Sequence, residues 1–127
     1  LPGAAEWVRT LHAEGWRQAI ASSAPRENVE VMHQALGFDG LIDTLVAAED
    51  VSRGKPDPEV FLEAARRLGV PPAKCIVVED AEAGIEAARR GGMPSVGVAG
   101  AGRESASVAV ASLADLPSDT FDHLVQE

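Results

Sequence analysis

Short apolar runs that suit β-strands alternate along this chain with stretches of helical periodicity. Proline opens and glycine closes most of the helical stretches, at positions where a missing N–H or a left-handed backbone costs little. Regular alternation of strand and helix is typical of a parallel sheet covered by helices on both faces, so the predicted fold class is α/β. The expected helices are 2–14, 25–37, 58–69 and 82–90, and the expected strands are 16–21, 41–47, 75–78 and 94–98, followed by a candidate edge strand within 108–116 and a helical turn near 121–125.

Two of the expected helices carry apolar stripes that should face the sheet. Positions three and four apart along a helix share one face, so apolar residues at that spacing mark the buried side. The stripes are Val29, Met32 and Leu36 in the second helix, and Phe61, Leu62, Ala65 and Leu68 in the third.

Size and composition fit one domain, residues 1–127. The chain has 127 residues, of which 46% are hydrophobic and 24% are charged, which is enough for one core and too little for two domains. No apolar run reaches the roughly 18–20 residues that span a bilayer, and no basic segment precedes a hydrophobic stretch at the start. We therefore expect neither a membrane span nor secretion.

Charge and cysteine content narrow the partners and the compartment. There are 20 acidic and 11 basic residues, for a net charge of -9, which disfavours a protein that binds the phosphate backbone of nucleic acids. Cys75 is the only cysteine, so no disulfide can form within the chain, and a cytoplasmic location is expected.

Two serines follow the first expected strand. Because binding sites in open parallel sheets lie at the carboxyl ends of the strands, residues there are the first candidates for function. Ser22 and Ser23 offer hydroxyls and backbone N–H groups just before a helix, an arrangement that favours an anion such as phosphate. The alternative is that one of them simply caps this helix.

A lysine stands in the loop Gly-Lys-Pro-Asp-Pro at 54–58. The glycine permits close approach of the backbone, and the following proline restricts Lys55 to an extended conformation. A lysine held in this way can point its ammonium at a phosphate or balance neighbouring carboxylates. The alternative is a solvated lysine in a turn.

Two adjacent acids, Glu79 and Asp80, follow the most apolar of the short strands. Paired carboxylates supply hard oxygen ligands for Mg²⁺, which completes its octahedron with substrate phosphate and water. Asp80 as a plain helix N-cap is the competing interpretation.

Other residues that could act in catalysis or binding do not stand in a sequence pattern typical of a site. A lone cysteine at the start of a buried strand is more typical of a core than of a nucleophile. The glycines of 97–102 are not followed by the Gly-Lys-Ser/Thr of a phosphate-binding loop, which favours a flexible turn. Histidines without metal-ligand spacing are expected to be solvated or structural. These residues are Cys75, Gly97, Gly100, Gly102, His12, His33 and His123.

Taken in order, three segments resemble the motifs of the haloacid dehalogenase superfamily, and within it the β-phosphoglucomutase-like branch of phosphatases and mutases. The segments are 20–25 (IASSAP), 54–61 (GKPDPEVF) and 77–88 (VVEDAEAGIEAA). The resemblance extends over nearly the whole chain. It implies a Rossmann-like core and Mg²⁺-dependent phosphoryl transfer from a small phosphorylated metabolite through an aspartyl-phosphate intermediate.

The resemblance also implies a role for each candidate. Ser22, with Ser23 beside it, matches the hydroxyl that binds the phosphoryl oxygens. Lys55 matches the lysine of the third motif, which makes it a catalytic and phosphate-binding residue. Glu79 and Asp80 match the acidic motif around Mg²⁺.

The first motif of the family, Asp-x-Asp-Gly-Thr, occurs nowhere in these 127 residues. In the family it supplies the nucleophile and the acid/base, ends the central strand and is followed by a small helical cap. We therefore expect the first strand and the cap to be absent from this chain, which makes 1–127 a partial core domain. The sheet should then be open between the strands that end at Ser22 and Asp80, with unpaired N–H and C=O groups facing the gap. Ala81 replaces the serine that often follows the two acids, a departure that changes no expected role.

Without that nucleophile, the chain alone is expected to have little or no phosphatase turnover. The alternative function is a non-catalytic module that binds phosphate and Mg²⁺, or that forms a homo-oligomer through its open sheet. A receiver domain also combines an acidic pair with Lys-Pro, but its acids come first, whereas here Lys55 precedes Glu79 and Asp80. The choice between phosphatase and mutase, and the identity of the metabolite, stay open because the cap carries them.

Overall fold

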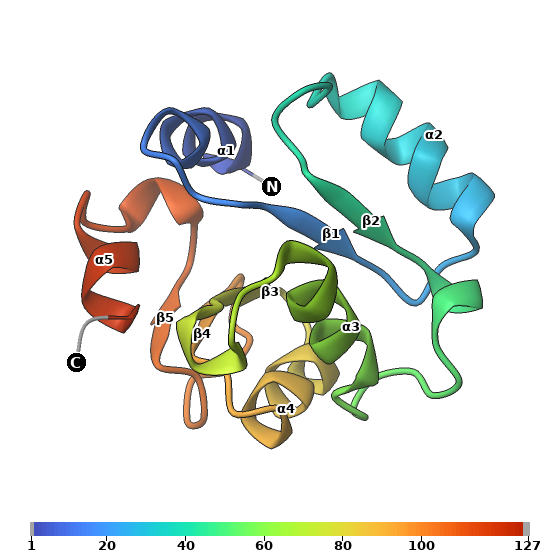
Figure 1. The fold of residues 1–127 in the computed structure, drawn as a ribbon. Helices are drawn as coiled ribbons and strands as arrows, with labels where there is room; N and C mark the ends of the chain where they lie inside the picture. Colours follow the sequence, from blue (N-terminus) through green and yellow to red (C-terminus); the bar gives the residue numbers. More distant parts are fainter. Residues whose placement is uncertain (1, 126–127) are drawn as a thin grey trace.

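The computed structural model describes residues 2–125, and its strands form two separate parallel sheets (Figure 1). One sheet has the order β1-β2 and the other the order β3-β4-β5. All pairings are parallel, which confirms the predicted α/β class. The strands are β1 (Ala19–Ala21), β2 (Thr44–Val46), β3 (Val77–Glu79), β4 (Ser95–Val98) and β5 (Val108–Val110).

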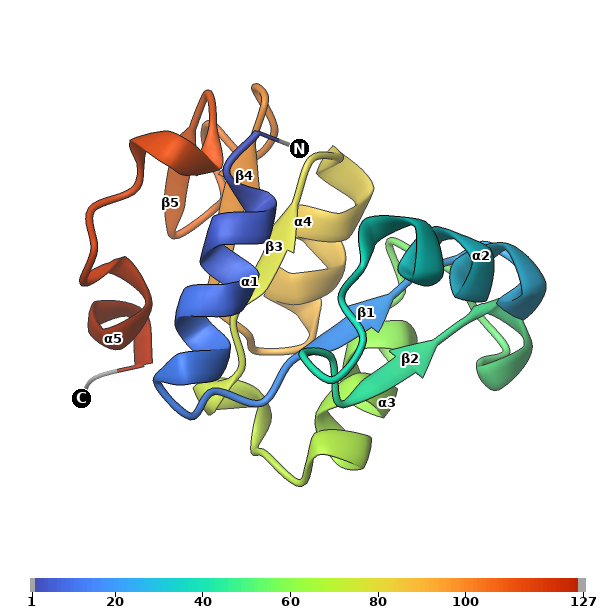
Figure 2. The same cartoon turned by 90° about the horizontal axis from the view of Figure 1, so that it is seen from above.

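Helices cover both faces of these sheets, as predicted. On one side α3 packs on β1 and β2, α4 packs on β3 and β4, and the two helices contact each other. This helix pair therefore holds the two sheets together. On the opposite side lie α1 and α2 (Figure 2). The helices are α1 (Ala4–Ala13), α2 (Arg26–Leu36), α3 (Glu59–Leu68), α4 (Glu82–Arg90) and the short α5 (Thr120–Val125). Short 3-10 turns lie at Ala48–Asp50, Pro72–Lys74 and Leu113–Asp115.

An apolar cavity of about 640 Å³ separates β1 from β3. Side chains of α1 and α3 line it on its two sides, among them Val8, Leu11, Phe61 and Ala64. Within the described residues β1 pairs only with β2, and β3 only with β4. The gap expected between these strands is thus confirmed.

Backbone hydrogen bonds show which peptide groups of β1 face this cavity. The Ser22 N–H donates to the Val46 carbonyl at 2.9 Å, and the Asp43 N–H donates to the Gln18 carbonyl at 2.7 Å. Because successive peptide groups of a strand point to opposite sides, those of Ala19 and Ala21 point away from β2 and toward β3. Within the described residues, the edge of β1 that adjoins the cavity therefore has no strand paired with it.

The apolar stripes are only partly as predicted. In α2 Val29 is buried, but Met32 and Leu36 are 44% and 47% exposed, because this helix packs chiefly on one strand, β2, of the narrow two-stranded sheet. In α3 the buried face includes Phe61 and Ala65, whereas Leu62 is 39% exposed. Leu62 lies a quarter turn beyond that face, so its assignment to the core was wrong.

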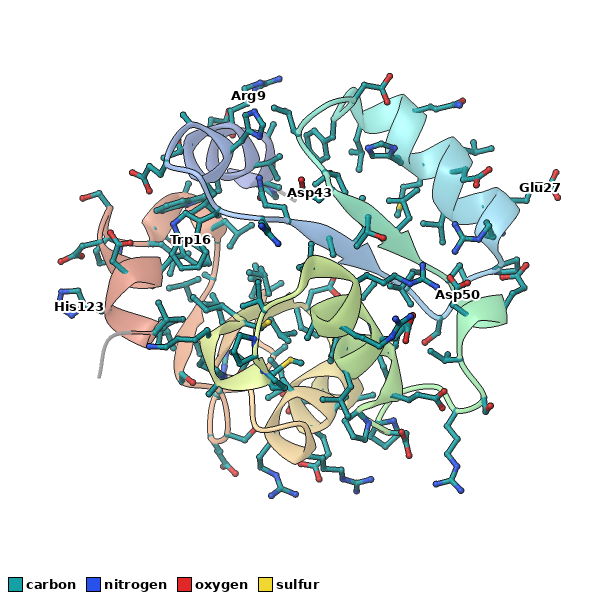
Figure 3. All side chains as sticks on the ribbon, in the orientation of Figure 1. Arg9, Trp16, Glu27, Asp43, Asp50 and His123 are labelled. Carbon is teal, nitrogen blue, oxygen red and sulfur yellow. The ribbon has the colours of Figure 1, made fainter. Side chains whose placement is uncertain are left out.

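The C-terminal segment docks on α1 through aromatic contacts. The ring of Phe121 lies edge-on to Trp7, with ring centroids 5.0 Å apart, and to Trp16 at 6.2 Å. Trp16 stands between α1 and α5 in Figure 3. The Trp7 indole N–H donates to the Leu113 carbonyl at 2.8 Å. The predicted edge strand and terminal helical turn are confirmed as β5 and α5. Among the described residues, no helix combines the length and apolar character needed to cross a membrane.

Candidate functional site

Lys55 joins the carboxyl ends of the two sheets. Its Nζ donates to Glu79 Oε2 at 3.0 Å, at the end of β3, and lies 3.5 Å from the Ala21 carbonyl oxygen, at the end of β1. The ammonium also sits 5.0 Å from the centroid of the Phe61 ring, where it gains a cation–π attraction. The Lys55 side chain is only 18% exposed, so the interpretation as a solvated lysine is wrong.

The loop that carries Lys55 is held by its own acidic residues. Glu59, at the start of α3, accepts hydrogen bonds from the backbone N–H groups of Ser52 and Arg53 at 2.9–3.1 Å. Asp57 Oδ1 accepts the Glu59 N–H at 3.0 Å, and the Asp57 N–H donates to the Gly54 carbonyl at 3.0 Å. These bonds fix the backbone on both sides of the lysine.

The serine loop lies beside the lysine loop. A Cβ built on Gly54 would lie 3.7 Å from Ser23 Oγ, so the two loops leave room for little more than one methyl group between them at this point. Ser22 Oγ accepts the Ala24 N–H at 3.1 Å, which orients this hydroxyl within its own loop. Ser22, Ser23 and Lys55 therefore meet at one edge of the fold.

The N-terminus of α2 is capped by an acid from another loop. The N-cap residue Pro25 makes no side-chain cap, and the Arg26 N–H donates to Glu49 Oε1 at 2.8 Å. Capping by Ser22 or Ser23 was thus the wrong alternative. Because a carboxylate already uses this helix terminus, an anion at this loop would have to be held by the two hydroxyls and Lys55 rather than by the helix end.

Glu79 and Asp80 stand at the same edge but in different environments. The Glu79 side chain is 11% exposed, with Oε2 bonded to Lys55 and Oε1 accepting the Asp80 N–H at 3.2 Å. Asp80 is exposed. The N-cap of α4 is Ala81, so the interpretation of Asp80 as a plain N-cap is wrong. The two acids therefore differ in availability: Glu79 is engaged and Asp80 faces solvent.

These two carboxylates fit part of a Mg²⁺ coordination sphere. Mg²⁺ is usually held by one or two carboxylates, with phosphate and water completing the octahedron. An acidic pair next to a lysine ammonium suits this chemistry. Within residues 2–125 there is no group of three His, Cys, Asp or Glu side chains arranged to hold a metal ion. The pair can thus contribute ligands and cannot by itself enclose the ion.

The most heavily bonded carboxylate near the site, Asp50, had no signal in the sequence. It pairs with Arg26 and, at 3.2 Å, with Arg67, and it accepts the Ala47 N–H at 2.8 Å. The hydrogen bond from Ala47, aided by both guanidinium groups, lowers the pKa of Asp50 below its usual value. Asp50, which Figure 3 places beyond the end of β2, therefore ties α2 and α3 to this strand.

The residues that the sequence analysis did not assign to a site mostly have contacts typical of a structural role. Burial raises the pKa of the Cys75 thiol, which donates to the Val70 carbonyl, as expected for a core cysteine rather than a nucleophile. His123 pairs with Asp119 at 3.0 Å. Gly97 lies inside β4 rather than in a turn, and a Cβ there would overlap the carbonyl of Ala101. The flexible-turn assignment was therefore wrong for Gly97.

Comparison with known proteins agrees with the motifs now located at one edge of the fold. A family profile described as haloacid dehalogenase-like hydrolase matches residues 1–92, which is most of the chain. The chain belongs to the haloacid dehalogenase-like hydrolases. This haloacid dehalogenase-like chain continues beyond the matched residues through β4, β5 and α5.

The relatives of this haloacid dehalogenase-like chain include phosphatases and a phosphoglucomutase. The bifunctional riboflavin kinase/FMN phosphatase of Arabidopsis thaliana is 41% identical over 87 residues, covering 66% of this chain and 22% of that protein. Hexitol phosphatase A of Escherichia coli (strain K12) is 39% identical over 84 residues, covering 66% of this chain and 38% of that protein. The structure of β-phosphoglucomutase from Clostridium difficile superposes with a TM-score of 0.86 at 31% identity, covering 98% of this chain and 56% of that one. The chain thus spans little more than half, or less, of each relative.

Proposed function

We propose that this chain forms the lysine, serine and acidic-pair portion of a Mg²⁺-dependent phosphoryl-transfer site for a small phosphorylated metabolite. The reaction passes through an aspartyl-phosphate whose aspartate is not among these 127 residues. The observation that carries the proposal is the bridge from Lys55 to Glu79 and to the Ala21 carbonyl, because it brings three separate motifs together at one edge.

The chemistry of the three motifs supports this function. A phosphate monoester brings negatively charged oxygens, and the Lys55 ammonium with the hydroxyls of Ser22 and Ser23 supplies a positive charge and donors at adjoining loops. Such groups hold a phosphoryl group in place and stabilise the charge that develops during transfer. Mg²⁺ bound by Asp80 and Glu79 would neutralise further charge on the phosphoryl oxygens.

The relatives support the substrate class. They are named as an FMN phosphatase, a hexitol phosphatase and a β-phosphoglucomutase, and each name refers to a reaction at a phosphate carried by a small hydroxylated molecule. In the proposed reaction the aspartate oxygen forms a bond to phosphorus while the bond from phosphorus to the substrate oxygen breaks, and that oxygen takes a proton from the acid/base of the same first motif. Phosphatases and phosphomutases share this step.

Calorimetric titration with orthophosphate in MgCl₂ tests the proposal on the 127-residue chain. We expect saturable binding that weakens about 10-fold or more in Lys55→Met, since a charge-assisted contact is lost. Lys74→Met is the matched control, because the Lys74 ammonium donates to the Val125 carbonyl at 2.8 Å, away from the three motifs. Absence of binding, or equal binding by Lys55→Met, would contradict the proposal.

Turnover is a separate measurement. With no nucleophilic aspartate, residues 1–127 alone should hydrolyse p-nitrophenyl phosphate no faster than buffer. Hydrolysis that is abolished by Lys55→Ala would show that the chain carries a complete site.

A further inference from the structure

Gly84 occupies the first turn of α4, where the backbone does not require a glycine. Its backbone is helical, unlike that of the eight glycines with positive φ, such as Gly92, which lies two residues beyond the last residue of the same helix. A glycine inside a helix weakens that helix relative to alanine. Alanine occupies positions 83, 87 and 88 around it. The reason for glycine must therefore lie in the space beside the helix.

Glu79 fills that space. A Cβ built on Gly84 would overlap the Cγ, Cδ and Oε2 atoms of Glu79. The Glu79 side chain thus lies directly across the bare turn of α4. Oε2, one of the atoms that would be displaced, is also the atom that accepts the hydrogen bond from Lys55.

We infer that Gly84 is a positioning residue for the Lys55–Glu79 pair. By leaving the first turn of α4 without a side chain, it lets the Glu79 carboxylate rest against the helix, 3.0 Å from the lysine ammonium. Its importance for ligand binding rests on the proposed function, whereas its effect on the pair does not.

Gly97 offers a contrast within the same chain. A Cβ at Gly97 would overlap the backbone carbonyl of Ala101, which cannot rotate away. The Glu79 side chain can rotate about its own bonds. Gly84→Ala should therefore keep the fold and move Glu79, while Gly97→Ala should lower the urea midpoint of unfolding.

The first test measures the pair and needs no ligand. Lys55→Met is introduced into the wild-type chain and into the Gly84→Ala chain, and urea midpoints are compared. In the wild type the substitution should lower the midpoint, because Glu79 loses its partner. In the Gly84→Ala background the same substitution should lower it clearly less, because Glu79 has already moved away. An equal loss in both backgrounds, or no loss in the wild type, would overturn the inference.

The second test uses orthophosphate in MgCl₂ as the probe. Gly84→Ala should weaken binding about 10-fold, the effect typical of mutating a residue that orients a ligand-binding side chain. In a Glu79→Ala background, Gly84→Ala should cause no further weakening. Further weakening there would mean that Gly84 acts by another route and would overturn the inference. If the wild type binds no phosphate, the proposed function fails while the urea comparison still decides the role of Gly84.

A folding control completes the design. If Gly84→Ala does not fold but Glu79→Ala/Gly84→Ala does, the collision with Glu79 is demonstrated directly. If neither folds, something other than Glu79 fills the space, and the inference is wrong.

Discussion

The Lys55 ammonium donates to Glu79 Oε2 across 3.0 Å, and this contact spans the two halves of a divided sheet. Lys55 belongs to the loop before α3, which packs on β1 and β2, whereas Glu79 ends β3. Both side chains are largely buried, at 18% and 11% exposure. The pair therefore couples the sheets as well as shaping the candidate site.

Lys55→Met should lower the free energy of unfolding by about 1–3 kcal/mol, because it leaves a largely buried carboxylate without its charged partner. The double variant Lys55→Met/Glu79→Gln should recover most of this loss, since the remaining amide carries no charge. Urea unfolding of the wild type, both single variants and the double variant measures the effect. A double variant no more stable than Lys55→Met would show that the charge of Glu79 does not cause the loss.

Filling the cavity should stabilise the chain. Ala64 lines the cavity between β1 and β3, so Ala64→Leu can place its added methyl and methylene groups in empty apolar space. We expect a gain of about 1–2 kcal/mol from the apolar surface that this buries. Ala87→Leu is the matched control: Ala87 belongs to the same core cluster but is fully buried, and overpacking there should cost about 1–3 kcal/mol. The midpoint of thermal unfolding should therefore rise in Ala64→Leu and fall in Ala87→Leu. A lower midpoint in both variants would show that the cavity cannot accept the larger side chain.

Because of Asp50, the free energy of unfolding should depend on pH in the acidic range. The Ala47 N–H and the guanidinium groups of Arg67 and Arg26 hold its pKa below the ordinary value of 3.8. A pKa that is lower in the folded state means that the stabilisation is fully present above about pH 4 and is lost as pH falls through the folded-state pKa. The difference in stability between wild type and Asp50→Asn should therefore be constant near neutrality and shrink below pH 4. Asp122→Asn, on the exposed face of α5, should run parallel to the wild type. A difference that stays constant down to pH 2 would contradict the role of the Asp50 charge.

The sequence predicts the elements well and the strand lengths poorly. Helix α4 has the predicted bounds, because α4 lies between a polar turn and two glycines. In contrast β1 begins at Ala19 rather than Trp16, and β2 at Thr44 rather than Leu41. Strand bounds depend on which neighbour supplies hydrogen bonds, and each of these strands has one neighbour among the described residues. Apolar character alone could not reveal that.

The sequence motifs predict which residues form the candidate site, but they do not predict the contacts between those residues. Ser22, Lys55, Glu79 and Asp80 lie at one edge because the carboxyl ends of parallel strands share an edge. The capping of α2 by Glu49 depends on a contact between residues 23 positions apart, which no local pattern encodes. The role of Gly84 could have been suspected from the sequence, because a glycine stands there in a helix whose neighbouring positions are alanines.

The position of the C-terminal helix α5 should depend on one aromatic ring, that of Phe121. At six residues, α5 is too short to be stable alone, so its position relies on the contacts of Phe121, which is 5% exposed, with Trp7 and Trp16. Phe121→Ala should cost about 3–5 kcal/mol and shift tryptophan emission to longer wavelength, because both indoles become more hydrated. The chain has two tryptophans and no tyrosine, so the emission reports on these rings alone. Phe121→Leu, which keeps most of the apolar volume, should shift the emission much less. Unchanged emission in Phe121→Ala would mean that α5 is held by other contacts, such as the hydrogen bond from Lys74 to the Val125 carbonyl.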